Sequence, residues 1–208
     1  MKIAIVAASG MTGTQLIEQA LAAGHEVIGL ARTPENIKSD DSRVSKRRGD
    51  AFDAQSIIDG LEGADAVITS VGKRDLFDKR YNLSTAAHEA VIAGMRKHNI
   101  NRLLVISSTG AAQIKRDGIR RNIYLFLRRK YYRDMYEMEL QVMDSGLDVT
   151  LVRAPYLVDE GAPGKYHVIE DETYPVGINI TRSNLANFLV NELENRQWSK
   201  RVIAVAAD

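Results

Sequence analysis

Short apolar runs rich in β-branched residues alternate along the whole chain with longer segments of helical periodicity. We expect strands at residues 2–7, 26–31, 44–48, 64–70, 102–107, 149–153 and 202–205. We expect helices from near residue 12 to a glycine cap at 24, and near 54–61, 83–98, 128–144 and 183–195. This alternation is typical of βαβ units, whose strands are parallel. Runs such as "RLLVISS" are apolar on both faces, which predicts an α/β, doubly wound, mostly parallel sheet with helices on both faces.

The length of the chain fits one domain. With 208 residues, of which 45% are hydrophobic, it can bury an ample core, and we expect residues 1–208 to form a single domain. Two irregular stretches, near 109–127 and 156–180, follow strand ends. Because ligands of open α/β sheets bind outside the carboxyl ends of the strands, we expect both stretches to be insertions on the substrate side.

Several function classes lack the residues that they need. The chain has no cysteine, which excludes disulfides, thiol catalysis and iron–sulfur ligation, so redox chemistry would require a bound cofactor. The four histidines are scattered without a metal-binding spacing, and we expect no metal site. No apolar run approaches the roughly 18 residues of a spanning helix, and the N-terminus is unlike a signal peptide. We therefore expect a cytoplasmic protein without membrane contact.

The segment "VAASGMTG" follows the first expected strand and opens the first helix. Gly10 would let the backbone approach a dinucleotide pyrophosphate, Gly13 would let the helix pack on the strand, and the helix N-terminus would face the negative charge. Ala7 stands where the usual fingerprint has its first glycine. The residues that we expect at the cofactor are Ala7, Ser9, Gly10, Met11, Thr12 and Gly13. An ordinary strand-to-helix turn is the alternative.

Arg32 and Thr33, in "GLARTPENI", stand at the end of the second strand, where an NAD-specific site carries an acidic residue. A guanidinium would bind a 2′-phosphate through two hydrogen bonds and offer a bare ribose little. Such a charge-assisted bond contributes about 1.5–3 kcal/mol. The sequence therefore predicts NADPH (NADP) as the cofactor, with a solvated arginine as the alternative.

Two further strand ends offer contacts to the nucleotide. Asp50, beside Ala51, could accept a hydrogen bond from the adenine amino group, or it could cap the following helix, a task open to Asp53 as well. Val71 and Gly72 follow the fourth strand, where the backbone must pass close to the nucleotide. A simple turn glycine is the alternative for Gly72.

The whole chain resembles a known family. The segments "IAIVAASGMTG", "GLART", "GDAFD", "ADAVITSVG", "LLVISSTG", "SGLDVTLVRAPYL" and "ITRSNLANFLV" are similar to the atypical short-chain dehydrogenase/reductases, an NAD(P)-binding Rossmann family. Within it the chain most resembles the biliverdin-IXβ reductase/flavin reductase branch and the nitrogen-metabolite-repression regulators, which bind NADP without known turnover. The resemblance implies that Ser108 lines the nicotinamide and substrate pocket, and we expect the neighbouring Ser107 to bind the cofactor. It also implies that Pro155 lies in the loop over the nicotinamide, and that Tyr156 replaces a histidine of the biliverdin reductase.

No tyrosine of this chain is followed four residues later by a lysine, the pair used by alcohol- and sugar-active members of that superfamily. Flavins, quinones and tetrapyrroles delocalise the incoming charge and can take their proton from solvent. We therefore expect an NADPH-dependent oxidoreductase that transfers hydride to a small conjugated acceptor. A non-catalytic NADP(H)-binding redox sensor is the alternative, followed by a sugar-nucleotide epimerase or dehydratase.

Residues 115–134 carry eight basic residues against two acidic ones, interleaved with aromatic residues. This basic segment could be a cationic aromatic rim for a planar anionic acceptor. It could instead contact a partner protein or nucleic acid through residues 115–133, or be a helix with packed aromatics and solvated arginines. The net charge of +1 does not favour nucleic-acid binding.

Overall fold

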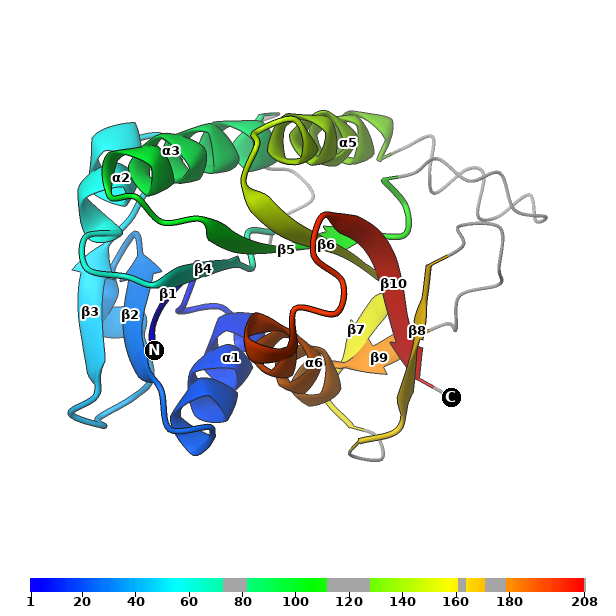
Figure 1. The fold of residues 1–208 in the computed structure, drawn as a ribbon, viewed down its shortest axis with the longest axis horizontal. Helices are drawn as coiled ribbons and strands as arrows, with labels where there is room; N and C mark the ends of the chain where they lie inside the picture. The colour runs from blue at the N-terminus through cyan, green and yellow to red at the C-terminus, as the bar shows by residue number, and fades with distance from the viewer. Residues whose placement is uncertain (73–81, 112–127, 161–163, 171–178, 208) are drawn as a thin grey trace.

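The computed structural model describes residues 1–72, 82–111, 128–160, 164–170 and 179–207. Its main sheet has the strand order β3-β2-β1-β4-β5-β6-β10-β8, and all neighbouring strands in it are parallel except β10 and β8 (Figure 1). These strands are β1 (Lys2–Val6), β2 (Glu26–Ala31), β3 (Val44–Arg48), β4 (Ala66–Thr69), β5 (Arg102–Ser108), β6 (Asp148–Ala154), β8 (Tyr166–Ile169) and β10 (Arg201–Ala207). The strand order reverses between β1 and β4, where doubly wound sheets bind their ligands.

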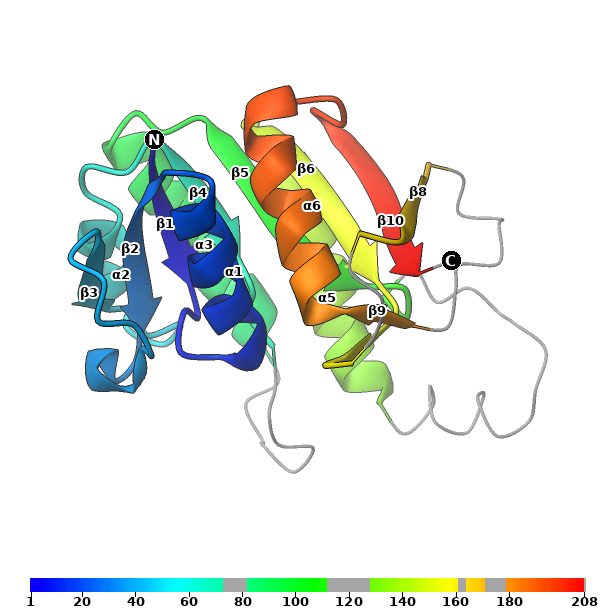
Figure 2. The same ribbon diagram turned by 90° about the horizontal axis from the view of Figure 1, so that it is seen from below.

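Helices cover both faces of the sheet, as the sequence predicts. Helices α1 (Met11–Ala22) and α6 (Arg182–Asn195) lie on one face. Helices α2 (Ala54–Gly60), α3 (Leu83–Lys97) and α5 (Arg129–Met143) lie on the other (Figures 1 and 2). The α/β fold with a mostly parallel, doubly wound sheet is therefore confirmed.

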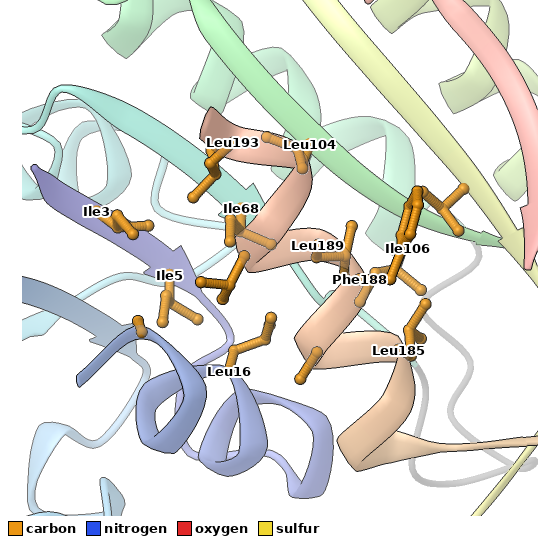
Figure 3. Packing of buried hydrophobic residues seen from close by; sticks show 14 of the residues in the cluster. Ile3, Ile5, Leu16, Ile68, Leu104, Ile106, Leu185, Phe188, Leu189 and Leu193 are labelled. Carbon is orange, nitrogen blue, oxygen red and sulfur yellow. The ribbon is translucent and has the colours of Figure 1, made fainter. Parts of the chain in front are cut away.

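In the described part of the chain, two large apolar clusters lie in the core, one on each face of the main sheet. In β5, Leu104 and Ile106 belong to the cluster under α1 and α6, whereas Leu103 and Val105 belong to the cluster under α3 and α5. Figure 3 shows Leu16 of α1 among the buried side chains of the first cluster, together with leucines of α6. This arrangement explains why the central strands are apolar at consecutive positions.

The end of α1 follows the sequence prediction. Gly24 adopts a φ of +83°, and its N–H donates to the carbonyl of Leu21. Glycine suits this position because a left-handed conformation is costly for residues with a Cβ atom.

The stretch from residue 156 onward contains three short strands that the sequence does not predict. Two of them, β7 (Tyr156–Val158) and β9 (Asn179–Thr181), form a separate parallel pair, and β8 is the outer strand of the main sheet. Strands of three or four residues are too short to produce a recognisable alternation. None of the described helices is long and apolar enough to cross a membrane.

Candidate nucleotide-binding site

The sequence-predicted site residues gather along one edge of the sheet. They follow, or stand at, the carboxyl ends of six neighbouring strands, β3, β2, β1, β4, β5 and β6. Because these strands are parallel, their carboxyl ends meet at the same edge. Residues as far apart in sequence as Ala7 and Tyr156 therefore border one candidate site, centred on the switch point between β1 and β4.

The loop after β1 begins with a left-handed residue. Ala7 has a φ of 66°, a conformation that costs a residue with a Cβ atom about 1 kcal/mol. The next N–H, of Ala8, donates to Leu30 O at 2.9 Å, and Gly10 N–H donates to Ala7 O at 3.0 Å. Ala7 thus takes the conformation for which a glycine is usually found, and the loop is tied to the end of β2.

Gly13 is required by the close approach of α1 to this loop. A Cβ atom at Gly13 would lie 2.6 Å from the carbonyl oxygens of both Ala7 and Ala8. At Gly10 the corresponding atom would lie 3.3 Å from Ala7 O, a tight but milder contact. The loop and helix therefore form the cradle that a glycine fingerprint predicts.

The N-terminus of α1 is free to bind an anion. Its cap residue, Gly10, has no side chain, and no acidic residue lies in the first turn. Thr14 N–H makes the first helical bond, to Gly10 O at 2.9 Å. The backbone N–H groups of Met11, Thr12 and Gly13 thus have no carbonyl partner within the helix. With the helix dipole, they fit the pyrophosphate of a dinucleotide.

Arg32 and Thr33 lie in the connection between β2 and a short 3-10 helix, η1 (Pro34–Asn36), and both are exposed. Within the described part of the chain, Arg32 has no ion-pair partner. Its guanidinium is available to an external phosphate at the end of β2.

The structure separates the two roles considered for Asp50. Asp53 is the N-cap of α2, and its side chain accepts the Ser56 N–H. The carboxylate of Asp50 accepts the Phe52 N–H at 3.1 Å instead. Asp50, with Ala51 beside it, is thus not needed as the cap, and its contact with adenine stays a prediction.

Val71 is half-buried and Gly72 is exposed, directly after β4. Among the described residues, a Cβ atom at Gly72 would meet nothing within 4 Å. The described part of the chain therefore does not require glycine here.

The two serines at the end of β5 have different surroundings. Ser107 is buried, and its hydroxyl donates to Glu139 Oε1 at 2.5 Å. Ser108 is half-buried, and its Oγ accepts the Gly110 N–H at 3.2 Å. Since its own proton is not used in that bond, the Ser108 hydroxyl can donate to a ligand.

A buried ion pair that we do not predict from the sequence lies next to Ser107. Arg153 of β6 donates to Glu139 of α5, with Nη2–Oε2 at 2.6 Å, and both side chains are almost completely buried. The sequence pattern does indicate that Glu139 is buried, because it shares its helix face with the apolar, buried residues Met135, Met138 and Val142. The pair and Ser107 join β5, β6 and α5 next to the candidate site.

Tyr156 is one of the exposed large side chains of the described residues. It follows Pro155, pairs with Asn179 between β7 and β9, and is 63% exposed. Its phenol is therefore accessible at the substrate side of the sheet edge, which is compatible with the role that the family resemblance implies.

Only the end of the basic segment, residues 128–134, lies in the described part of the chain. There Tyr132 is buried, while Arg129, Lys130 and Arg133 are exposed. This part is compatible with the interpretation of a helix whose aromatic residues pack on the core and whose basic side chains are exposed. Residues 115–127 lie outside the described residues.

A buried acid holds the start of α3. Asp134 of α5 accepts hydrogen bonds from the N–H groups of Ser84 and Thr85, at 2.9 and 3.1 Å, and from the Thr85 hydroxyl. The cap residue of α3, Asn82, makes no side-chain cap bond, so Asp134 replaces it from another helix.

His88 links α3 to the end of β4. Its Nδ1 donates to Ser84 O at 2.8 Å, so its Nε2 can accept the Thr69 hydroxyl at 2.8 Å. Burial lowers the pKa of His88 to about 4, although the Ser84 carbonyl and the Asp134 charge act in the opposite direction. His88 is therefore neutral at pH 7. Among the described residues, no three acidic or histidine side chains come together to hold a metal ion.

A protein-family model described as NAD(P)H-binding matches residues 7–196. The chain belongs to this NAD(P)H-binding family. It is 29% identical to protein YLL056C of Saccharomyces cerevisiae over 169 residues, which cover 76% of this chain and 54% of the yeast protein. The chain thus spans about half the length of that relative.

Solved structures share the fold of this NAD(P)H-binding protein. A short-chain dehydrogenase/reductase from Veillonella parvula in complex with NADP matches with a TM-score of 0.83 and 16% identity, covering 99% of this chain and 94% of that one. ChuY, an anaerobilin reductase from Escherichia coli O157:H7, matches with a TM-score of 0.82 and 21% identity, covering 100% and 97%. The family confirms the predicted binding of NAD(P)H, and the solved structures share the predicted Rossmann-type fold.

Proposed function

We propose that the protein is an NADPH-dependent reductase that transfers hydride to a small conjugated acceptor, such as a flavin, a quinone or a linear tetrapyrrole. The observation that carries the proposal is the cradle at the switch point, where Gly13 lies too close to Ala7 and Ala8 for any Cβ atom. The loop, the open N-terminus of α1 and the unpaired Arg32 at the end of β2 fit the diphosphate and the 2′-phosphate of NADPH.

The residues of the chain have separate tasks in this proposal. Ala7 to Gly13 hold the pyrophosphate, Arg32 binds the 2′-phosphate, and Asp50 accepts the adenine amino group. Bound NADPH supplies the hydride. Ser108 donates a hydrogen bond to the nicotinamide amide or to the acceptor, and Tyr156 closes the pocket over the planar ring. The acceptor gains the hydride and a proton from solvent, and NADP⁺ is released.

The missing tyrosine–lysine pair supports a conjugated acceptor. No tyrosine of the chain is followed four residues later by a lysine. An alkoxide product needs a positioned acid, whereas a conjugated ring spreads the charge and needs less help. The structural neighbour described as an anaerobilin reductase supports the tetrapyrrole class.

The test is the oxidation of NADPH by the purified protein with flavin mononucleotide, a quinone or a linear tetrapyrrole as acceptor. NADH and a protein-free mixture serve as controls. We expect protein-dependent oxidation that is faster with NADPH than with NADH. Oxidation at the protein-free rate with every acceptor would reject the reductase.

A redox sensor is the second candidate, because the lack of a tyrosine–lysine pair is equally compatible with a protein that does not turn over. The exposed Arg129, Lys130 and Arg133 at the start of α5 offer a surface for a partner. A sensor must bind that partner with different affinity in the presence of NADPH and of NADP⁺, since a ligand shifts an equilibrium only by differential affinity.

A further inference from the structure

A second arginine, like Arg32, stands at the carboxyl end of a strand, and the two strands are neighbours in the sheet. Arg48 is the last residue of β3 and pairs in register with Ala31, the last residue of β2. Gly49 N–H donates to Ala31 O at 2.9 Å, which fixes the two strand ends side by side. Arg32 follows Ala31 directly, so the backbones of Arg32 and Arg48 lie close together at the carboxyl ends of β2 and β3.

The guanidinium of Arg48 is ion-paired with the carboxylate of Asp53, the N-cap of α2. Both side chains are accessible, at 57% and 40% exposure. A guanidinium has five N–H donors, so this bond leaves several for an incoming phosphate. Asp53 also balances the charge of Arg48 when no anion is bound.

The other arginines near β3 have different partners. Arg47, on the opposite face of the strand, donates to the backbone carbonyls of Gly60 and Glu62 at 3.0 and 2.7 Å, so its role is to join β3 to the end of α2. Arg43 forms an ion pair with Asp41 just before β3, at the far end of the strand. Arg48 alone of these three stands next to the carboxyl end of β2.

We propose that Arg48 is a second ligand of the 2′-phosphate, so that Arg32 and Arg48 form a two-arginine clamp, with Asp53 orienting Arg48 before the nucleotide binds. The clamp rests on the proposed function, because it requires a nicotinamide dinucleotide in the glycine loop. A phosphate monoester carries close to two negative charges at pH 7, which two guanidinium groups match. NADH has only a hydroxyl at this position and gains nothing from the second arginine.

The experiment measures binding and does not need turnover. Dissociation constants for NADPH and NADH are obtained by titration of nucleotide fluorescence with the parent and with Arg48→Gln and Arg43→Gln. We expect Arg48→Gln to weaken NADPH binding about tenfold and to leave NADH binding unchanged. Arg43→Gln, the matched control with its own ion pair, should change neither constant. Asp53→Asn, which can still cap α2 but loses the ion pair with Arg48, should weaken NADPH binding less than Arg48→Gln does and leave NADH binding unchanged.

Four outcomes would support or overturn the two-arginine clamp. Circular dichroism spectra establish that each variant is folded before its dissociation constants are compared. Loss of NADPH affinity alone in Arg48→Gln supports the clamp. Unchanged NADPH affinity in that variant overturns it, and the reductase proposal then stands or falls on the acceptor assay alone. Equal loss for both nucleotides also overturns it, since the effect would then not depend on the 2′-phosphate. A parent that binds NADPH and NADH equally overturns the clamp together with the role of Arg32.

Discussion

The ring of Tyr132 lies against the backbone of Gly110, so closely that a Cβ atom at Gly110 would be 2.3 Å from the ring. Tyr132 belongs to α5, whereas Gly110 lies in the loop that follows β5 and donates its N–H to Ser108 Oγ. The contact therefore connects the helix that begins in the basic segment to the serine that we expect at the nicotinamide.

The first prediction concerns this contact. Gly110→Ala should destabilise the protein by about 1–3 kcal/mol, because the ring or the loop must move to admit the methyl group. The free energy of unfolding in urea measures the effect. The double variant Gly110→Ala with Tyr132→Leu should lose less than the two single variants added together, since the smaller side chain removes the clash. Additive losses would show that the ring is not the obstacle.

The second prediction separates the two serines of β5. Ser108→Ala should lower kcat at least about tenfold with the acceptor of the reductase assay, while NADPH affinity stays the same. Ser107→Ala should instead lower stability by about 1 kcal/mol, because it removes a buried hydrogen bond to Glu139. If Ser108→Ala turns over as fast as the parent, its proposed role is wrong.

The third prediction concerns the glycine cradle. Gly13→Ala should reduce NADPH affinity at least about tenfold, since the new methyl group would push the start of α1 away from the loop. Gly10→Ala should have a smaller effect, because its nearest contact is 3.3 Å. Titration of nucleotide fluorescence, together with melting temperatures for both variants, distinguishes lost binding from lost folding. Equal affinities in the two variants would contradict the steric argument.

The fourth prediction concerns the buried ion pair. Glu139→Leu should destabilise the protein by about 3–5 kcal/mol, because the guanidinium of Arg153 would stay buried while losing the carboxylate of Glu139. Adding Arg153→Met removes the buried guanidinium, so the double variant should be more stable than Glu139→Leu alone. Urea unfolding of the three proteins is the measurement, and a double variant that is less stable than the single one would refute the argument.

The fifth prediction is a pH dependence. The pKa of His88 is lowered from 6.5 to about 4 in the folded protein, so the unfolded chain binds more protons between these values. The contribution of His88 to stability is complete above pH 6.5 and decreases as the pH falls toward 4. We expect the preferential protonation of His88 in the unfolded chain to lower the free energy of unfolding by about 2 kcal/mol at pH 5 relative to pH 7.5. Urea unfolding at both pH values should show a smaller loss for His88→Gln than for the parent, and equal losses would exclude His88 as the cause.

The strands that carry the site were predictable from local pattern. The bounds expected for β2 and β3 match the structure, and the helices differ by at most a residue or two at their ends. Their apolar runs are long and their caps, such as Gly24 and Asp53, have recognisable chemistry. The strands β7, β8 and β9 are too short for that kind of signal.

The nucleotide-binding part of the site was predictable for the same reason, since its residues follow strand ends directly. The side-chain contacts between different helices and strands were not predictable. Asp134 caps α3 from α5, Arg153 meets Glu139 across β6 and α5, and Arg48 stands beside Ala31 only because β2 and β3 pair in that register. Such contacts depend on which elements pack together, and the sequence within each element does not contain that information.

The position of β3 adds a consequence for solubility. Among the described strands it is the outermost on its side of the sheet, so one row of its backbone groups has no described strand beside it, and such a row can pair with the edge of another molecule. Its exposed Lys46 places a positive charge along that edge, which opposes the approach of a second copy. Substitutions in β3 that change cofactor preference should therefore retain Lys46, since removing its charge would make association through this strand easier.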